Sequence, residues 1–388
     1  MRYTRAKVEF QPRLRNAGEP VRRRYRILSG ILLVLALGVV SLAISMSHNT
    51  PCGPTPPLTA GATAMKAIVH HCYGSADVIR YEDVPKPAPA DDEILVKVHA
   101  ASVNPLDWHY LEGTPYMLRL DAGLGAPADP RLGVDFSGTV EAVGKKVTRY
   151  KPGDEVFGGK FGALADYVTV REDRAIAPKP TNATHQQAAA IAIAAITALQ
   201  GLRDKGHIHP GQQVLINGAS GGVGTFGVQL AKSFGATVTG VCSTKNIELV
   251  RALGADRVVD YTQEDITRGT QRYDLILDNV ATHSLFDYRR IMNPDAVYVL
   301  IGSSDHGHWF GWLWKPLQAW VISPFTSQKF GMIFADLRQE DLATLASLME
   351  SGKLTPVIDR TYELKDAADA LRYLEKGHAR GKVVVTID

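Results

Sequence analysis

The chain has 388 residues, of which 45% are apolar, so it is long enough to build more than one globular core. Its formal charge of +3 is uneven: residues 1–26 contain nine Lys or Arg against Glu9 and Glu19, a net +7, which leaves −4 for residues 27–388. This balance excludes a body that binds nucleic acid through general positive charge.

Three cysteines, Cys52, Cys72 and Cys242, are spread along the chain. They are too few and too scattered to predict a disulfide framework or a paired-cysteine metal site. We therefore expect buried or idle thiols.

A basic tail over residues 1–26 precedes an apolar segment, residues 27–46, that contains no charge. Twenty helical residues at about 1.5 Å each cover the roughly 30 Å hydrocarbon core of a bilayer, so we expect a membrane anchor helix. A cleaved signal peptide is the alternative, although its apolar core is usually only about 7–15 residues long. The proline-rich residues 47–64 then form an extended tether, unless Met65 is the true start of the protein.

Residues 65–186 contain short runs of alternating apolar residues, punctuated by Gly and Pro. This pattern predicts a compact β domain. The clearest expected strands are Ile94–Val98, Thr139–Val143 and Tyr167–Val170.

From residue 187 to residue 326 strands and helices alternate, which predicts a doubly wound parallel sheet and an α/β fold class. The expected strands are Val214–Ile216, Val238–Val241, Arg257–Val259, Leu275–Leu277 and Val297–Ile301.

The stretch "VLINGASGGVGTFGVQLAKSFGA" places a glycine turn between the first of these strands and an amphipathic helix. The N–H groups that begin a helix lack intrahelical acceptors and attract anions, so this turn predicts a site for a dinucleotide pyrophosphate rather than a purely structural turn. The residues expected to bind the cofactor here are Gly218, Ala219, Ser220, Gly221, Gly222, Val223 and Gly224.

A family resemblance rests on residues around the same turn, namely Gly211-Gln212, Leu215, Ala219-Ser220-Gly221-Gly222, Gly224, Gln229 and Lys232. Their order resembles the signature of the zinc-independent quinone oxidoreductase and zeta-crystallin branch of the medium-chain dehydrogenase/reductase superfamily. From Met65 to Asp388 the resemblance implies a GroES-like domain, residues 65–186 and 327–388, joined to a Rossmann domain, residues 187–326. In this arrangement a helix near Asp366–Lys376 and the strand Val383–Ile387 return to the first domain.

The second strand of the Rossmann unit ends in "VTGVCSTKN", without the carboxylate that usually binds the ribose of NAD. Ser243 and Lys245 can instead bind a 2′-phosphate, so NADPH is the expected cofactor unless Lys245 is only a solvated surface lysine. Tyr261 is expected to cover the adenine end. The resemblance adds Thr197, Asn279 and either Arg380 or Lys382 as further cofactor contacts.

By the same resemblance, the three zinc-ligand positions of metal-dependent relatives fall near Asn104, Val134 and Ile193. None of these residues is a usual zinc ligand, so no metal is expected.

Without a Lewis acid, direct hydride transfer to a quinone or an enone is easier than oxidation of an alcohol. In "SVNPLDWHYLEGTPY", Asn104 matches an asparagine of the family and is the expected donor to the developing oxyanion. His109 stands where several quinone oxidoreductases have tyrosine; it is a candidate proton donor or a structural histidine, with Tyr110 and Tyr116 in reserve. Asp107 is expected to fix the loop.

The sequence therefore favours a zinc-independent NADPH-dependent reductase of quinones or α,β-unsaturated carbonyls. Two alternatives remain open: a trans-2-enoyl thioester reductase, and a catalytically idle NADPH-binding protein tethered to a membrane. A homodimer is possible, and no nucleic-acid partner is expected.

Residues 308–325, "HWFGWLWKPLQAWVISPF", contain four of the five tryptophans. Such a segment is a lid over the substrate pocket, a buried subunit-contact helix, or a surface at the bilayer interface. The basic tail places the N-terminus inside by the positive-inside rule, which would send the body outward, so the side of the membrane stays open.

Overall fold

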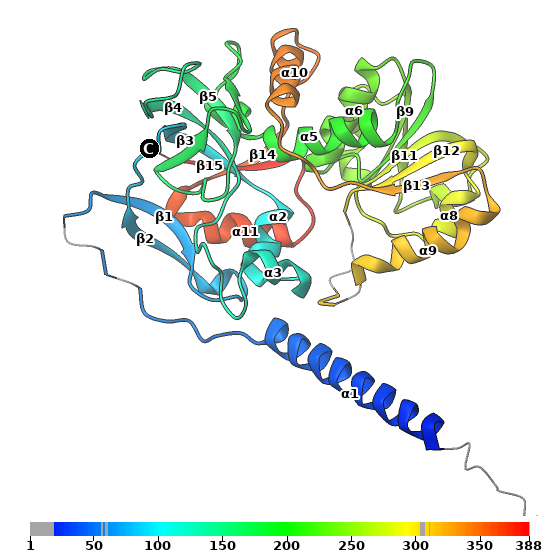
Figure 1. Ribbon diagram of the computed structural model, residues 1–388. Helices are drawn as coiled ribbons and strands as arrows, with labels where there is room; N and C mark the ends of the chain where they lie inside the picture. Colours follow the sequence, from blue (N-terminus) through cyan, green and yellow to red (C-terminus); the bar gives the residue numbers. More distant parts are fainter. Residues whose placement is uncertain (1–18, 56, 59–60, 303–306, 310, 388) are drawn as a thin grey trace, which may run out of the picture. The chain divides into compact units, whose positions relative to one another are not determined.

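The computed structural model describes residues 19–55, 57–58, 61–302, 307–309 and 311–387 (Figure 1). The start of the basic tail, His306 and Phe310 lie outside these residues, as do the side chains of residues 19–27 and 312. The chain divides into two compact units, Met1–His48 and Asn49–Asp388.

The first unit contains one helix, α1 (Glu19–Ser47), in its described part. Leu28–Ser47 is long and apolar enough to cross a membrane, and the apolar side chains of this stretch are exposed. The helix expected at residues 27–46 is therefore present, and it begins eight residues earlier, inside the basic tail.

The β domain of the second unit combines a hairpin with a larger sheet. Strands β1 (Ala64–His70) and β2 (Ile79–Pro85) form the antiparallel hairpin. The seven-stranded sheet has the order β14-β15-β3-β4-β5-β7, and β6 pairs with β3. Its strands are β3 (Glu93–Val103), β4 (Asp135–Val143), β5 (Glu155–Gly159), β6 (Tyr167–Arg171), β7 (Ile176–Pro178), β14 (Ile358–Glu363) and β15 (Lys382–Thr386).

The C-terminal segment completes this β domain, as the resemblance implied. Strand β15 pairs antiparallel with β3, and helix α11 (Ala367–Glu375) packs against β14, β15 and α2 (Pro105–Glu112). Gly377, with a φ of +70°, follows the end of α11, close to the helix end expected near Lys376.

The Rossmann sheet has six parallel strands in the order β10-β9-β8-β11-β12-β13. The strands are β8 (Gln213–Asn217), β9 (Thr237–Cys242), β10 (Arg257–Asp260), β11 (Tyr273–Asp278), β12 (Met292–Leu300) and β13 (Lys329–Met332). The order reverses between β8 and β11, and in such folds the ligand binds outside the carboxyl ends of the strands at this point.

The sixth strand corrects the expected boundary at residue 326. Lys329–Met332 pairs with β12 and belongs to the Rossmann sheet. The strand is only four residues long and includes Gly331, so it has no alternating pattern that the sequence could have revealed.

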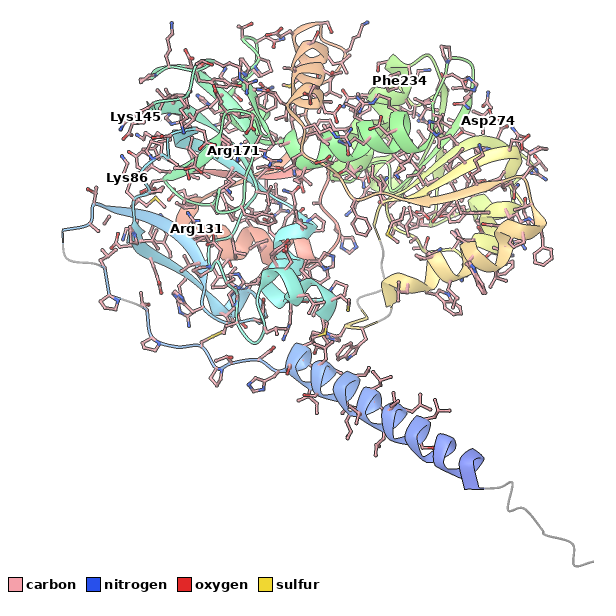
Figure 2. All side chains as sticks on the ribbon, viewed as in Figure 1. Lys86, Arg131, Lys145, Arg171, Phe234 and Asp274 are labelled. Atoms are coloured by element: carbon pink, nitrogen blue, oxygen red, sulfur yellow. A yellow bond between two sulfur atoms is a disulfide. The ribbon has the colours of Figure 1, made fainter. Side chains whose placement is uncertain are left out.

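Helices cover both faces of this sheet (Figure 1). They are α5 (Ala192–Gln200), α6 (Gly222–Ser233), α7 (Ile247–Ala252), α8 (Leu285–Arg289), α9 (Trp314–Ile322) and α10 (Gln339–Glu350). Helix α5 is buried almost throughout and packs against α6 and α10. Phe234, at the end of α6 and labelled in Figure 2, packs against the hydrophobic core that includes Val214 on β8 and Leu230 on α6.

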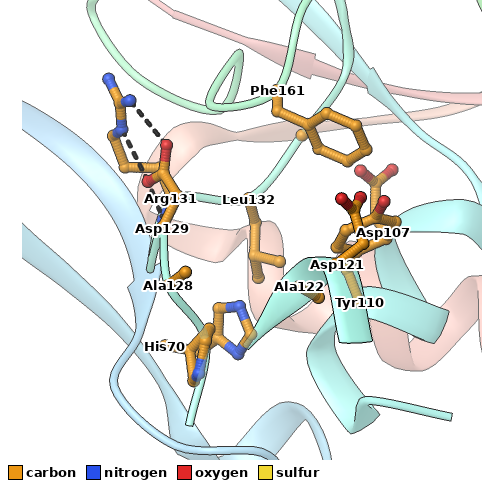
Figure 3. Close-up of a pocket in the computed structure, with 12 residues that line it drawn as sticks. His70, Asp107, Tyr110, Asp121, Ala122, Ala128, Asp129, Arg131, Leu132 and Phe161 are labelled. Carbon is orange, nitrogen blue, oxygen red and sulfur yellow. Dashed lines mark hydrogen bonds and ion pairs between the residues drawn. The ribbon is translucent and has the colours of Figure 1, made fainter. Parts of the chain in front are cut away.

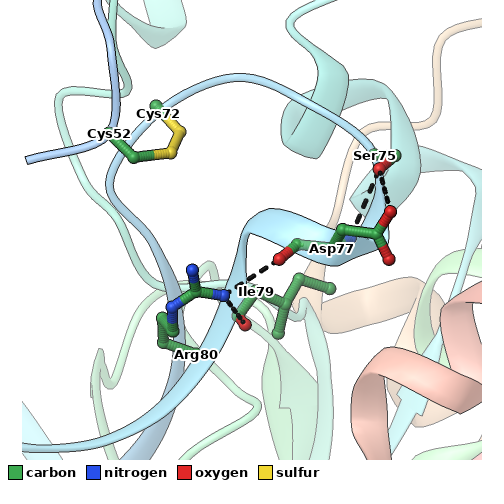
Figure 4. Close-up of a disulfide and its surroundings, with 6 residues drawn as sticks. All are labelled: Cys52, Cys72, Ser75, Asp77, Ile79 and Arg80. Atoms are coloured by element: carbon green, nitrogen blue, oxygen red, sulfur yellow. Dashed lines mark hydrogen bonds between the residues drawn. A yellow bond between two sulfur atoms is a disulfide. The ribbon is translucent and has the colours of Figure 1, made fainter.

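The structure contradicts the expectation that all three cysteines are free. Cys52 and Cys72 form a disulfide with a Cα–Cα distance of 4.9 Å (Figure 4). The count of cysteines could not show this, because the pairing depends on how the chain folds back after β1. Cys242 is a buried free thiol, as expected, and burial raises its pKa to about 11.

The disulfide is one of several attachments between the tether and the body. Thr50 N donates to Gly125 O at 2.8 Å, and Thr55 Oγ1 donates to Glu82 Oε1 at 2.5 Å. The segment expected to be an extended tether is thus fastened to the β domain over much of its length.

The number of reactive thiols in the full-length protein tests this pairing. Denatured without reductant, the protein is expected to take up one maleimide-polyethylene glycol, on Cys242, and after reduction three. The Cys72→Ser variant should take up two without reductant. Three adducts on the unreduced wild-type protein would contradict the disulfide.

Candidate active site

The glycine turn after β8 is shaped by two glycines that the fold itself requires. Gly218 has a φ of +73°, and a Cβ there would lie 2.6 Å from Val280 Cγ2. A Cβ on Gly224 would lie 2.1 Å from the carbonyl oxygen of Gly218. A side chain at either position would therefore displace the turn from the end of the strand.

Gly221 and Gly222 leave open space in front of helix α6, because they have no side chains. Gly221 is the N-cap of α6 and Gly222 its first residue, and an added Cβ would approach no atom closer than 3.5 Å and 3.4 Å, respectively. The first N–H groups of a helix have no intrahelical acceptor and carry partial positive charge. The space in front of α6 therefore fits a pyrophosphate that is bound by backbone N–H groups.

A side-chain bridge brings the end of β9 next to this turn. Asn246 Nδ2 donates to Ser220 Oγ at 2.9 Å and lies 3.3 Å from Ser243 Oγ. Lys245 is exposed in the same 3₁₀ turn, and Tyr261 N donates to Cys242 O at 3.1 Å. Ser243, Lys245 and Tyr261 thus gather at one edge of the turn. Asn246 did not stand out in the sequence, since an asparagine in a short turn is not distinctive.

The carboxylate at the end of β10 has its own partners. Asp260 Oδ2 accepts from Thr244 Oγ1 at 2.5 Å, and Oδ1 accepts from the backbone and the hydroxyl of Thr262. These bonds hold the pKa of Asp260 below its ordinary value. The carboxylate therefore fixes the two loops at this end of the sheet.

At the switch point, a buried network holds the loop after β11. The carboxylate of Asp278 accepts from Asn217 Nδ2 at 2.8 Å, Tyr298 OH at 2.6 Å and Ala281 N at 2.8 Å. Asn279 Nδ2 donates to Asn217 O at 2.7 Å. The network places Asn279 beside the glycine turn, with its Oδ1 buried and without a hydrogen-bond partner among the described atoms.

Asn104 lies in a buried charged cluster at the other side of the turn. Its Oδ1 accepts from Lys382 Nζ at 2.5 Å, and its Nδ2 donates to Asp135 Oδ2 at 3.0 Å. Asp135 is fully buried and also accepts from Ser102 Oγ at 2.9 Å, Lys382 Nζ at 3.2 Å and Ile193 N at 2.9 Å. Both ends of the Asn104 amide therefore have protein partners.

Lys382 joins this cluster to the glycine turn. The preceding residue, Gly381, donates its N–H to Ser220 O at 2.9 Å. A Cβ on Gly222 would lie 3.4 Å from Lys382 Cδ. The lysine stem thus passes the start of α6, and its ammonium lies between the expected cofactor site and Asn104.

Asp107 fixes the start of α2, as expected. Its Oδ2 accepts from Asn104 N at 2.7 Å. Burial raises the pKa of Asp107 to about 7, and the neighbouring Asp135 adds to the rise while Lys382 opposes it.

The candidate proton donors lie on different sides of α2. His109 Nδ1 lies 2.8 Å from Thr114 O, so the neutral ring carries its proton on Nδ1. The ring of Tyr110 packs against Phe161 at 4.5 Å, within the β domain. Tyr116 instead contacts the Rossmann half: its N–H donates to His308 O at 2.8 Å.

Thr197 is placed by α5, next to the Asp135 cluster. Its hydroxyl donates to Ile193 O at 2.6 Å, and Ile193 N bonds to Asp135. The structure therefore groups Asn104, Thr197 and Lys382 around one carboxylate that the sequence analysis missed. Asp135 directly follows Val134 in "GVD", and its position there was the available signal.

A cavity of about 190 Å³ lies beside α2, within the β domain (Figure 3). Asp107, Tyr110 and Phe161 line it, together with His70, whose pKa burial lowers to about 4. None of the expected cofactor-binding residues, and neither Asn104, His109 nor Tyr116, lines this cavity, so it is separate from the glycine turn.

The donor set at the former metal position does not suit zinc. Asn104, Val134 and Ile193 offer one amide and two hydrocarbon side chains. In the part of the chain that the structure describes, no group of three or more His, Cys, Asp or Glu could hold a metal ion. The charged group at this place is the Lys382 ammonium.

Two family models match the chain: the alcohol dehydrogenase GroES-like domain over residues 90–181 and the zinc-binding dehydrogenase family over residues 253–385. The trans-enoyl reductase pgmF of Aspergillus terreus is 35% identical over 76% of this chain and 87% of its own length. The mitochondrial NAD(P)H oxidoreductase RTN4IP1 of Mus musculus is 34% identical over 92% and 100%, respectively.

Among solved structures, the quinone oxidoreductase from Coxiella burnetii matches with a TM-score of 0.73 and 29% identity, over 84% of this chain and 100% of that chain. These similarities agree with a fold that joins a GroES-like domain to a parallel Rossmann sheet. The chain belongs to the zinc-independent branch of the medium-chain dehydrogenase/reductase superfamily and is an NAD(P)H-dependent oxidoreductase.

Proposed function

We propose that the protein reduces a quinone or the alkene of an α,β-unsaturated carbonyl with NADPH. The observation that carries this proposal is the buried Asn104–Lys382–Asp135 cluster, which lies beside the cofactor turn where zinc-dependent relatives hold their metal. Bound NADPH supplies a hydride, and the acceptor oxygen gains negative charge. That charge needs a donor and a proton rather than a metal.

Different residues would supply the hydrogen-bond donor and the proton. The Lys382 ammonium has three N–H bonds, of which Asn104 and Asp135 accept two, so one is available to an oxyanion or to the cofactor. Asn104 and Asp135 hold the ammonium in place. His109 and Tyr116 remain the candidate proton donors. His109 lies on α2, a few residues after Asn104, and Tyr116 contacts His308 of the Rossmann half.

A trans-enoyl thioester is the second candidate acceptor, since it accepts hydride at the same position relative to a carbonyl. The similarity to a trans-enoyl reductase favours it. A non-catalytic NADPH-binding protein would keep the turn but would not need the charged cluster.

For the cofactor, NADPH is preferred over NADH. Residues 243–247, which follow β9, contain no carboxylate, and Ser243 and Lys245 lie together at this edge of the turn. The carboxylate of Asp260, at the end of the neighbouring strand β10, accepts hydrogen bonds from Thr244 and Thr262.

For localisation, we infer that α1 anchors the protein in a membrane with the body on the side opposite the basic tail. Basic residues stay on the cytoplasmic side, and the Cys52–Cys72 disulfide is typical of an oxidising compartment, so two independent features agree. A homodimer would use the outer edge of β13, where the Rossmann sheet ends.

NADPH oxidation by the full-length protein, assayed against a panel of quinones, enones, enoyl thioesters and simple aldehydes, tests the reaction. We expect turnover of quinones or enones that survives exhaustive chelation. Stoichiometric zinc that is lost together with activity, or turnover of aldehydes alone, would refute the proposal.

Lys245→Glu tests the cofactor. Loss of one charge-assisted phosphate contact is expected to weaken NADPH binding at least about tenfold, or about 1.4 kcal/mol, and NADH binding little. The matched control is Lys353→Glu, another exposed lysine of the chain. Equal losses for both cofactors would remove Lys245 from the site.

Asn104→Ala tests the cluster. It deprives Lys382 and Asp135 of a shared partner, and we expect kcat/KM for the acceptor to fall roughly 10–100-fold, as for the loss of an oxyanion donor. NADPH affinity, measured by fluorescence titration, should change much less. An equal loss of cofactor affinity would assign Asn104 to the cofactor instead.

A further inference from the structure

Helix α9 exposes an apolar face where a surface helix is normally polar. Its Lys315, Gln318 and Ile322 side chains are buried; Gln318 Oε1 accepts from Leu285 N at 2.9 Å. The other face exposes residues at helical spacing, and Trp320 is 76% exposed. With Phe325, which is 77% exposed, these residues form what we call the α9 patch: Trp314, Leu317, Trp320, Val321 and Phe325.

A second apolar patch lies in the β domain, around the short helix α3 (Arg119–Ala122). Met117, Leu120 and Leu124 are each about half exposed and form what we call the α3 patch. Neither patch is explained by the fold, since none of these side chains is needed to fill a core.

The segments that lead into the two patches are in contact between the β domain and the Rossmann domain. Tyr116, next to Met117, donates its N–H to His308 O at 2.8 Å, and its ring contacts Trp309 edge-on at 4.8 Å. Trp309 is five residues before Trp314. In Figure 1, α3 and α9 accordingly lie along the same side of the second unit.

The tether enters the body at this same place. Thr50 N donates to Gly125 O at 2.8 Å, directly beside Leu124. Thr50 is three residues after Ser47, the end of the apolar helix α1, and three residues reach at most about 10 Å. The apolar helix therefore ends only three residues before a residue that is hydrogen-bonded beside the α3 patch.

The chemistry of both patches suits the interface of a bilayer. Tryptophan is favoured there, and residues 307–328 contain no acidic side chain that would be repelled by anionic headgroups. Lys329 is exposed immediately after them, and Arg289, which donates to Phe325 O at 3.3 Å, adds a second cation at the rim.

We propose that the α3 and α9 patches rest on the bilayer that holds α1, and that lipid-dissolved acceptors reach the candidate site beside Tyr116 directly from the membrane. The second clause rests on the proposed reductase function. It narrows the substrate to a quinone or enone with a hydrophobic tail.

Fluorescence quenching by lipid tests the contact. The full-length protein is reconstituted in nanodiscs of phosphatidylcholine with or without bromine on the acyl chains. Tryptophan emission should fall with brominated lipid, and the Trp314→Phe/Trp320→Phe variant should lose most of that fall. The control Trp108→Phe, on α2, should keep it. An unchanged fall in the double variant would overturn the proposal.

Kinetics test the route of entry. Leu120→Glu and Trp320→Glu should each raise KM at least about tenfold for a long-chain quinone in the nanodisc and leave the parameters for a short water-soluble quinone unchanged. Tyr81→Glu, which alters an exposed aromatic residue on β2, is the control. Equal KM values for wild type and variants with the long-chain quinone would overturn direct entry.

Two further outcomes are separable. If α9 crosslinks to a second copy and brominated lipid does not quench Trp314 and Trp320, the face is an interface between copies and the proposal fails. If neither quinone is reduced by the wild-type protein, the reductase function fails, while the quenching result still decides whether the patches touch lipid.

Discussion

The site depends on one buried carboxylate. Asp135 accepts hydrogen bonds from Ser102 on β3, Asn104 at the start of α2, Ile193 in the first turn of α5 and Lys382 on β15. A buried carboxylate is costly unless its oxygens are bonded, so these four segments must meet correctly for the chain to fold. Because α5 belongs to the Rossmann domain and the other three segments to the β domain, the same carboxylate links the two domains.

The buried cation beside Asp135 is an ammonium. Lys382 can donate hydrogen bonds but cannot act as a Lewis acid. In the proposed reaction this favours acceptors whose reduction leaves an oxyanion that hydrogen bonds can stabilise. The glycine turn, linked to Lys382 through Gly381 and Ser220, places the cofactor site within reach of the ammonium.

The segment expected to be a free tether is instead part of the second unit. Thr50, Cys52 and Thr55 each join it to the β domain, by a backbone hydrogen bond, a disulfide and a side-chain hydrogen bond. Residues 49–55 therefore do not act as a flexible proline-rich linker.

The sequence by itself determined the features that depend on neighbouring residues. Strand, turn and helix signals are local, so the sequence alone indicated the glycine turn and the apolar helix. It also showed that β9 is followed by no carboxylate and that the expected metal position has no zinc ligands. Contacts between distant residues were not. Asp135 and Lys382, Cys52 and Cys72, and the short strand β13 came from tertiary structure alone. Their partners are selected by the folding of the whole chain, since only packing of the two domains brings a carboxylate from β4 to a lysine on β15.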